Sequence, residues 1–406
     1  MAKELWLFTI SYPFGNGESY IESELPILAR GFERVRVLPL LPEGRQRPLP
    51  PNAEVTILLN SDLYRTAGPL RVALDLRRWS HVLRVSKASA PDRGTYRRHR
   101  RELMSRVRQA MYRERVLRDR LERSYDPAHI VLYSYWTSDW ATVLGLWKLD
   151  RPDVRFTARM MGFDLFDHRA PGGWQMLQAF HVEQAGRLVP ISRAGLDHML
   201  ARFPGYRDKF MLGHLATMDH GAGPWAPADR LRIASCSNLY ALKRVHLVIE
   251  ALDRLRLPVK WTHFGDGPER AALEKLVRDL PPIIEVEFMG SRPNTEVMAW
   301  YKANPVDVFV HMSRTEGGAP VALQEAASFG IPLIAANAGG VNEIVTPYTG
   351  ILLPLESTGD DLAAMLHGFY HSGWRAAQTR ETVRAFWRAH FHAEDVHGRL
   401  LAELLR

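Results

Sequence analysis

The segment Ser313–Ala335 carries residue types that suit the binding of a phosphate or a sugar. One carboxylate, Glu316, precedes a glycine loop, and a second, Glu325, lies in a helix that we predict near Ala319–Phe329. The loop consists of Gly317, Gly318 and Ala319. Free backbone N–H groups at a helix start bind phosphate, and carboxylates accept hydrogen bonds from hydroxyls. The segment therefore predicts a phosphate or sugar site. The alternative is a plain strand–loop–helix joint with a solvated Glu325.

This segment resembles the signature of retaining nucleotide-sugar glycosyltransferases with the GT-B fold, grouped as glycosyltransferase family 4 (glycosyl transferases group 1). The matching residues are Glu316, Gly317, Gly318, Glu325, Ala326, Gly330 and Pro332. The similarity continues in 338–345, which resembles the family's Gly-Gly-x-x-Glu-Ile-Val element. The resemblance implies that Glu325 binds the nucleotide ribose and that Glu316 and the first loop face the donor sugar.

The spacing of the two carboxylates departs from the family pattern. Eight residues separate Glu316 from Glu325 instead of seven, and Gln324 stands at the expected position of the second carboxylate. A one-residue bulge in the loop would keep both carboxylates in place. Without it, Glu316 would be displaced by about 3.3–3.6 Å of chain.

A second loop, after the predicted strand 231–235, is similar to the family's diphosphate-binding loop. A fixed cation beside a leaving diphosphate stabilises its negative charge, and we expect Lys243 to be that cation. The family usually has an Arg five residues earlier, where this chain has Asn238, and Arg244 is the candidate to replace it. The alternative is that Lys243 and Arg244 are surface residues of a helix start.

The turn 264–268, Phe-Gly-Asp-Gly-Pro, is similar to a family turn in which Gly265 approaches the donor closely. A nicotinamide cofactor is disfavoured, because Pro268 follows the second glycine and Arg270 stands where a dinucleotide fingerprint has its last glycine.

The loop after the first predicted strand resembles the family's N-terminal glycine loop. Gly15 and Gly17 allow a ligand to approach the backbone, and Glu18 at a helix start can accept hydrogen bonds from hydroxyls. The resemblance places Gly15, Asn16 and Glu18 beside the acceptor and Gly17 beside the donor diphosphate. A plain turn is the alternative.

The segment 157–166 is similar to the family pattern Arg-x-His-Gly-x-Asp-Leu, which places Arg159 and Asp164 on the sugar side. Met161 replaces the histidine that in the family contacts the transferred sugar, and a thioether is a poor hydrogen-bonding substitute. The change predicts a different donor preference, a substitute such as His168, or reduced activity.

The elements that position these residues follow an alternating pattern. Six short apolar runs typical of strands lie between residues 4 and 191, and six more lie between 231 and 353, with helical patterns between most of them. We therefore expect an α/β protein made of two doubly wound Rossmann-like domains, which the resemblance makes a GT-B fold with a cleft between them. The predicted divisions are an acceptor domain 1–213, a linker 214–229, a donor domain 230–380, and C-terminal helices 381–406 packing back on the first domain.

Positive charge is concentrated between residues 71 and 123, where 17 Lys and Arg stand against 6 Asp and Glu, although the net charge of the chain is only +8. Over 97–123 apolar residues recur at helical spacing, which predicts a basic amphipathic helix. Such a helix suits anionic lipid headgroups, at roughly 1 kcal/mol per cation, and favours a lipid-linked acceptor. The alternatives are a solvated helix face and nucleic acid, which no accompanying motif supports.

The composition narrows the class of protein further. A single cysteine, Cys236, excludes an intramolecular disulfide and a cysteine-rich zinc cluster, and 46% hydrophobic and 24% charged residues are typical of a globular protein. The sequence has no apolar run of about 18 residues and no signal peptide pattern. We expect a cytoplasmic protein, in part peripheral on the inner face of the membrane.

The predicted activity is transfer of a sugar from a nucleoside diphosphate sugar to a hydroxyl of a glycan or lipid-linked glycan, with retention of configuration and without a metal or other cofactor. It would serve cell-surface polysaccharide or glycoconjugate synthesis. One alternative is a GT-B epimerase or hydrolase, which needs no second substrate. Another is a weakened sugar-binding scaffold, suggested by Met161, Asn238 and the carboxylate spacing.

Overall fold

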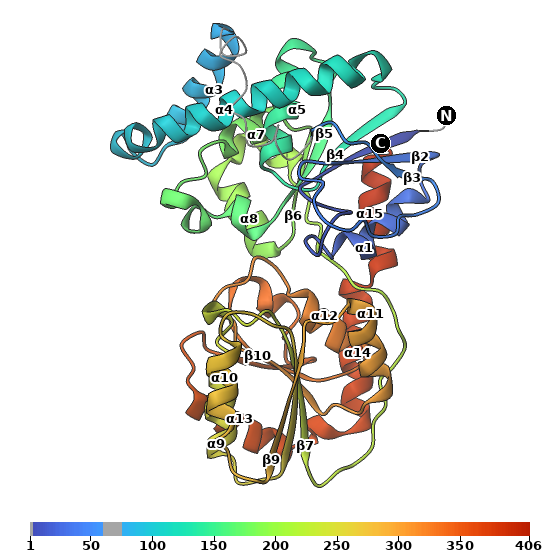
Figure 1. The fold of residues 1–406 in the computed structure, drawn as a ribbon, viewed down its shortest axis with the longest axis vertical. Coiled ribbons are helices and arrows are strands. Elements are labelled where there is room, and N and C mark those ends of the chain that lie inside the picture. Colours follow the sequence, from blue (N-terminus) through green and yellow to red (C-terminus); the bar gives the residue numbers. More distant parts are fainter. Residues whose placement is uncertain (1–2, 60–74) are drawn as a thin grey trace. The chain divides into compact units, whose positions relative to one another are not determined.

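The computed structural model describes residues 3–59 and 75–406, which fall into two compact units (Figure 1). The first unit comprises Met1–His214 and His397–Arg406, and the second comprises Leu215–Val396. Of the expected linker 214–229, His214 therefore belongs to the first unit and the remaining residues belong to the second. The expected C-terminal segment 381–406 is divided, because only its last ten residues belong to the first unit.

The first unit is built on a six-stranded parallel sheet in the order β3-β2-β1-β4-β5-β6. The strands are β1 (Glu4–Thr9), β2 (Arg34–Pro39), β3 (Ala53–Val55), β4 (Ile130–Ser134), β5 (Phe156–Met160) and β6 (Arg187–Pro190). Strand β1 pairs with β2 on one side and β4 on the other, and five of its six residues are buried. A continuous apolar run of this kind is typical of a parallel strand covered on both faces.

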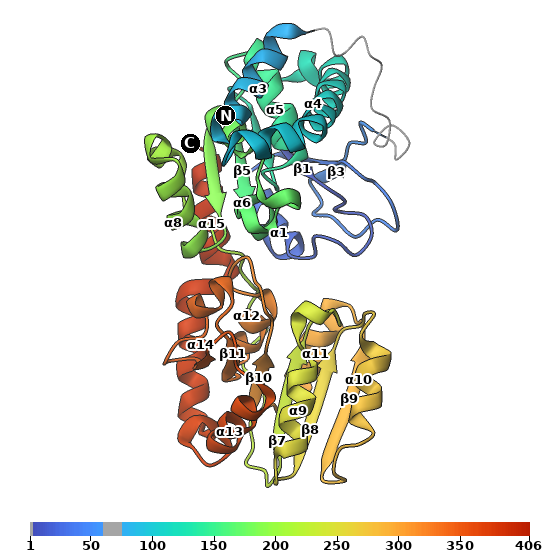
Figure 2. The ribbon, with the colours of Figure 1, turned by 90° about the vertical axis from the view of Figure 1, so that its left-hand side faces the viewer.

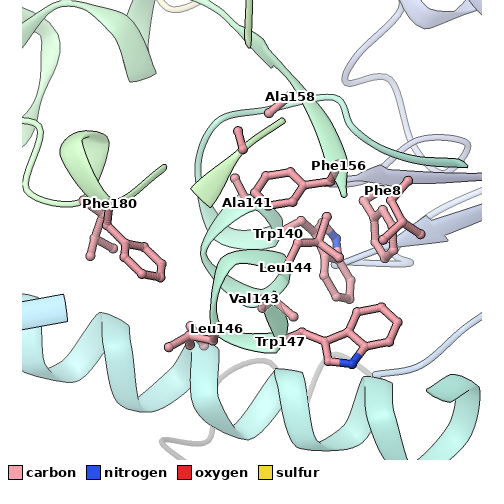
Figure 3. Packing of buried hydrophobic residues seen from close by; sticks show 14 of the residues in the cluster. Phe8, Trp140, Ala141, Val143, Leu144, Leu146, Trp147, Phe156, Ala158 and Phe180 are labelled. Atoms are coloured by element: carbon pink, nitrogen blue, oxygen red, sulfur yellow. The ribbon is translucent and has the colours of Figure 1, made fainter. Parts of the chain in front are cut away.

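The helices of the first unit are α1 (Ile21–Ala29), α3 (Leu76–Ser89), α4 (Arg93–Leu121), α5 (Asp139–Asp150), α6 (Gly162–Leu165), α7 (Gln178–Gln184), α8 (Arg193–Arg202) and the end of α15 (Ala393–Leu404). Figure 3 shows the core around α5, where Trp140 lies beside Phe8 of β1, with ring centroids 5.1 Å apart. Trp147 and Leu144 of the same helix are fully buried. This packing makes α5 a rigid support for the loop that follows β4.

Helix α4 confirms the predicted amphipathic pattern. It begins after Asp92, whose carboxylate accepts a hydrogen bond from Thr95 N at 2.8 Å, so it starts four residues before the predicted helix. Its buried face includes Leu103, Val107 and Leu117, and most of its arginines lie outside that face.

The second unit has a six-stranded parallel sheet in the order β12-β11-β10-β7-β8-β9 (Figure 2). The strands are β7 (Leu231–Cys236), β8 (Val259–Phe264), β9 (Ile284–Gly290), β10 (Val308–His311), β11 (Leu333–Ala336) and β12 (Gly350–Leu353). Helices lie on both faces in Figure 1, with α9 (His246–Arg254), α10 (Arg270–Val277) and α13 (Gly359–Tyr370) on one and α11 (Asn294–Ala303), α12 (Val321–Ser328) and α14 (Ala377–Phe391) on the other. The unit is therefore doubly wound, as predicted.

The order of strands in the second sheet reverses between β7 and β10. At such a point the loops that follow the two central strands run to opposite faces and leave a crevice at the carboxyl edge of the sheet, where ligands of open α/β sheets bind. The loops after β7 and β10 carry Lys243 and Glu316. None of the helices in the described residues is long and apolar enough to cross a membrane.

Candidate active site

The two loops at this crevice bring Lys243 and Glu316 together. Lys243 Nζ donates a hydrogen bond to Glu316 Oε1 at 2.6 Å, and His311 Nε2 lies 2.9 Å from the same oxygen. Lys243 ends a short 3-10 helix (Ala241–Lys243), and His311 is the last residue of β10. Residues 73 positions apart in the sequence thus form one charged cluster. His311 was not among the residues that the sequence pointed to.

The cluster keeps Glu316 ionised. Burial alone would raise the pKa of the carboxyl, but the hydrogen bond with His311 and the charges of His311 and Lys243 lower it to about 2. Lys243 therefore has a permanent anionic neighbour, which holds its ammonium group in place. The lysine side chain remains 21% exposed, so it can also reach an anionic ligand.

Arg244, the expected replacement for the missing arginine, is less exposed than Lys243. Its guanidinium is buried, and its Nε donates a hydrogen bond to the backbone oxygen of Met312 at 2.7 Å. The backbone N–H of Arg314 in turn donates to Leu242 O at 2.8 Å. These bonds join the loops after β7 and β10, and Arg244 Nη2 is buried without a hydrogen-bond partner among the described residues. Asn238, at the position of the missing arginine, is exposed.

Gly265, directly after β8, packs closely against the loop that follows β7. A Cβ atom at this residue would lie 1.9 Å from the backbone oxygen of Ser237, and its φ of 129° is one that side-chain-bearing residues rarely adopt. On either side of this contact, Ser237 N donates to Phe264 O and Leu239 N donates to Asp266 O, each at 3.0 Å. Only glycine allows the two loops to approach so closely.

The glycine loop that contains Gly317, Gly318 and Ala319 rests on the segment after β11. A Cβ atom at Gly339 would lie 2.0 Å from Glu316 O, and one at Gly340 would lie 2.7 Å from Gly318 Cα. The Gly-Gly pair of the 338–345 element therefore fixes the path of the first loop. The loop leads into α12, whose N-terminus has no side-chain cap. Uncapped N–H groups of this kind are available to an anion.

Glu325 lies in α12 and is almost completely buried. Its Oε1 accepts a hydrogen bond from Asn294 Nδ2 at 2.6 Å. Burial raises the pKa of the carboxyl to about 7, against the opposing effect of the Asn294 bond. Burial raises the pKa of the Cys236 thiol, at the end of β7, to about 12; the charge of Glu325 adds to this increase and that of Lys243 opposes it.

Glu18 in the first unit does not lie at the start of a helix, where the sequence predicted it. Helix α1 begins only at Ile21, and the Glu18 carboxylate turns inward to accept hydrogen bonds from Ser11 N at 2.7 Å and Tyr12 N at 2.6 Å. Trp136 Nε1 donates to it as well. The carboxylate therefore organises the loop after β1. Its oxygens are already bonded to the protein.

The tip of the same loop is open. Asn16 and Gly17 are exposed. Gly15 has a φ of 63°, and its backbone N–H donates a hydrogen bond to Arg45 O at 3.1 Å. Of the predicted residues in this loop, Asn16 and Gly17 are thus the ones available to a ligand.

Arg159 lies in the interior of the first unit. It is 0% exposed and donates to Glu24 Oε2 at 2.6 Å, to Tyr133 Oη at 2.8 Å and to Gly213 O at 2.7 Å. The match to the family pattern at this residue therefore marks a buried ion pair between β5 and α1. It stabilises the framework and does not face a sugar.

Asp164 and Met161 form the turn after β5. Both are buried, and the Asp164 carboxylate accepts hydrogen bonds from Met161 N at 2.6 Å and Thr137 N at 2.9 Å. Burial raises the pKa of Asp164 to about 8, although these two bonds oppose the shift. Asp164 thus ties the loop after β4 to the loop after β5.

The geometry of the second unit agrees with a comparison to known families. Residues 225–385 match the family model described as Glycosyl transferases group 1, so the second unit contains a domain of that family.

Two curated relatives match parts of the chain. The GDP-mannose-dependent alpha-mannosyltransferase of Mycobacterium tuberculosis is 39% identical over 134 residues, which are 32% of each chain. The sulfoquinovosyl transferase of Arabidopsis thaliana is 35% identical over 184 residues, 42% of this chain and 34% of that protein. The chain thus spans about a third of the length of the curated relatives that it matches.

Solved structures match over the whole length. The Anabaena protein HepE in complex with UDP and glucose has a TM-score of 0.65 and 16% identity and is covered over 98% of both chains. Sucrose-phosphate synthase from Thermosynechococcus elongatus has a TM-score of 0.67, 16% identity and 99% coverage of both. At these identities the likeness shows the fold, and the fold of this protein is GT-B.

Proposed function

We propose that the protein is a retaining glycosyltransferase that transfers a sugar from a nucleoside diphosphate sugar to a hydroxyl of a glycan or lipid-linked glycan, in the synthesis of a surface polysaccharide or glycoconjugate. The observation that carries this proposal is the Lys243–Glu316 pair at the strand-order reversal, inside the region that matches the glycosyl transferases group 1 family. The mannosyltransferase relative is GDP-mannose-dependent and HepE was solved with UDP, so UDP and GDP are the first nucleotides to test.

The residues of the second unit fit the parts of a nucleotide-sugar donor. The Lys243 ammonium and the uncapped N–H groups at the start of α12 would neutralise the diphosphate, and Glu325 would bind the ribose hydroxyls. Because the leaving phosphate can take the proton of the attacking hydroxyl, no protein base is required. Since the lysine and the N–H groups supply the positive charge, we expect activity without an added metal ion.

Thermal unfolding with UDP and GDP tests this donor site. A nucleotide present at 100 times its dissociation constant stabilises the native state by about 2.7 kcal/mol, which gives a clear increase in Tm. We expect Lys243→Ala to abolish that increase. Lys260→Ala is the matched control, because Lys260 pairs with the exposed Glu285 at 2.7 Å on another part of the same unit. It should retain the full increase.

The same assay and a turnover assay separate the alternatives. If neither UDP nor GDP raises the Tm of the wild-type protein, the proposed donor site is refuted. The hypothesis of a weakened sugar-binding scaffold then replaces it. If a nucleotide sugar is consumed at the same rate with and without an acceptor, the protein is an epimerase or hydrolase. Product linkage determined by NMR would show retention or inversion directly.

We further propose that α4 binds an anionic membrane surface near a lipid-linked acceptor. The first half of the helix exposes Arg97, Arg98, Arg100 and Arg101, and its opposite face is buried against the unit. Each cation near an anionic bilayer contributes roughly 1 kcal/mol. We expect binding to vesicles that contain phosphatidylglycerol, with loss at high salt, and no binding to pure phosphatidylcholine.

The triple variant Arg97→Gln, Arg98→Gln and Arg101→Gln should bind these vesicles at least about tenfold more weakly, because about three cations are lost. A control with the same loss of charge replaces three exposed arginines of the second unit, Arg256, Arg278 and Arg292, with glutamine. Co-sedimentation that weakens equally in both variants would show a nonspecific effect of net charge and refute a role of α4.

A further inference from the structure

The first unit contains a cavity that the residues discussed above do not account for. It has a volume of about 400 Å³ and lies between α4, the segments that follow β4 and β5, and α7. Its lining residues include Arg106 of α4, Thr142 of α5 and His181 of α7. This volume falls within the range of small-molecule pockets, roughly 300–1,000 Å³.

Three lining side chains have buried polar atoms that lack hydrogen-bond partners within the described residues. These atoms are Trp174 Nε1, a donor, Gln178 Oε1, an acceptor, and His181 Nδ1, and the three residues are 1%, 2% and 3% exposed. The orientation of the Gln178 amide is fixed, because its Nε2 donates to Leu165 O at 2.7 Å and Asp164 O at 3.2 Å. Buried polar groups are nearly always hydrogen-bonded, so these atoms can take a water or a ligand in the cavity as their partner. A hydroxyl group can serve a donor and an acceptor alike.

The inner wall of the cavity is polar but uncharged around α7. His181 Nε2 lies 2.7 Å from Thr142 Oγ1, and burial lowers the pKa of this histidine to about 3, outweighing the nearby charge of Asp139. The imidazole is therefore neutral at physiological pH. Phe163 adds an aromatic surface at the opening, since its side chain is 43% exposed. Neutral hydrogen-bonding groups beside aromatic rings suit a sugar ring, which has hydroxyl groups at its edge and C–H groups on its faces.

One cation of the lining has no counter-ion within the part of the chain that the structure describes. Arg106 is bonded to Glu102 at 2.7 Å, and the carboxylate of Asp139 is bonded to Arg113. Arg169, which is half-buried, forms no ion pair with any residue in the described ranges 3–59 and 75–406. A guanidinium group pairs in a planar, two-point geometry with carboxylate or phosphate.

We propose that this cavity binds a sugar ring that carries an anionic group, with its hydroxyls at Trp174 and Gln178 and its anion at Arg169. The assignment of this ring to the acceptor substrate rests on the proposed function, because the second unit is occupied by the donor in that proposal. The binding of the ring itself is a property of the first unit alone.

Ligand-observed saturation-transfer NMR on the full chain tests the cavity, with methyl glucuronide as the anionic probe and methyl glucoside as the neutral one. We expect the glucuronide to bind more tightly. Arg169→Gln should weaken glucuronide binding by about tenfold, as expected for the loss of a hydrogen bond to a charged group, and leave glucoside binding unchanged. Trp174→Phe, which removes the N–H donor together with part of the buried indole, should weaken both.

Arg155→Gln is the matched control, because Arg155 is exposed on the first unit and does not line the cavity. Absence of binding of both probes, or equal binding that Arg169→Gln does not change, overturns the proposal. The nucleotide-induced Tm increase is measured on the same samples. Saccharide binding without a nucleotide response would refute the proposed donor function and leave the cavity assignment intact, and the reverse result would refute the cavity assignment alone.

Discussion

Two buried carboxylates in the second unit have pKa values that are shifted in opposite directions. Burial alone would raise the pKa of Glu316, but its hydrogen bonds with Lys243 and His311 and the charges of these two residues lower it to about 2. Among the described residues, Glu325 has only the neutral amide of Asn294 as a side-chain hydrogen-bond donor, so burial raises its pKa to about 7. Residues of the same type therefore have different charge at neutral pH. The ionised Glu316 positions a cation, and Glu325 can exchange a proton with its surroundings.

The raised pKa of Glu325 makes a testable contribution to stability. Between pH 4.5, its ordinary value, and about 7, the native carboxyl holds a proton that the unfolded chain has released, so the free energy of unfolding falls as the pH rises through this window. Glu325→Gln cannot ionise and should remove that decrease, up to about 3 kcal/mol at pH 8. Urea unfolding at pH 5 and pH 8 measures the difference.

The exposed Glu296→Gln serves as the control for this experiment and should change neither value by more than about 0.5 kcal/mol. An equal stability of wild-type protein and Glu325→Gln at both pH values would show that Glu325 is ionised in the native state. Because an amide is a poorer acceptor for two hydroxyls than a carboxylate, Glu325→Gln should also reduce the Tm increase caused by a nucleotide.

The motif matches identified these positions as candidate site residues, but they did not show which side chains would be accessible to a ligand. Glu18, Arg159 and Asp164 were expected on the sugar side, and each is bonded to the protein instead. Their partners come from distant parts of the chain, such as Trp136 and Glu24. A spacing pattern contains no information about such long-range partners. His311 and Asn294 were missed for the same reason.

At the scale of elements, the sequence was more informative. All twelve predicted strands are present. They could be predicted because a buried parallel strand has a local sequence pattern, a short apolar run between turns. Helix ends were predicted less well: α4 spans Arg93–Leu121 instead of 97–123, since the Asp92 cap sets its start. The close approach of loops at Gly265 and Gly339 depends on tertiary contacts, although the glycines themselves gave a signal.

Alanine at Gly265 tests the requirement for this approach. The new Cβ would lie 1.9 Å from Ser237 O at a φ that disfavours side chains, so the β7 loop must shift. We expect Gly265→Ala to destabilise the protein by about 2 kcal/mol or more and to abolish the nucleotide-induced Tm increase. Urea unfolding and the Tm assay measure the two effects.

Gly368→Ala is the matched control, because Gly368 lies in α13 and a Cβ there would meet no atom within 4 Å. Alanine in a helix interior should stabilise by about 0.5–1 kcal/mol and leave nucleotide binding intact. Equal behaviour of the two variants would contradict the tight packing of the loops.

At the scale of the whole molecule, the first unit is completed by the end of the chain. Leu400 and Leu404 of α15 are 2% and 5% exposed, and Arg187 of β6 donates to Glu403 Oε1 at 2.5 Å. Leu401 lies so close to Gly31 that a Cβ at this glycine would be 2.5 Å from its Cδ1. We expected the C-terminal helices 381–406 to pack back on the first domain, and only residues 397–406 belong to the first unit. Which residues dock on the first unit depends on the three-dimensional packing.

Truncation after Val396 therefore should destabilise the first unit selectively. Burial of one leucine side chain contributes about 1.5–3 kcal/mol, so the loss of Leu400 and Leu404 alone should cost about 3–6 kcal/mol. Differential scanning calorimetry should show the transition of the first unit at lower temperature and an unchanged transition of the second unit. The transition of the second unit is recognised because nucleotide raises its temperature.

The pair Leu400→Ala and Arg399→Ala isolates the packing effect, because Leu400 is buried and Arg399 is exposed. The leucine variant should lose about 2–5 kcal/mol in the first transition and the arginine variant almost nothing. If truncation lowers both transitions equally, the end of α15 stabilises the whole chain and not the first unit.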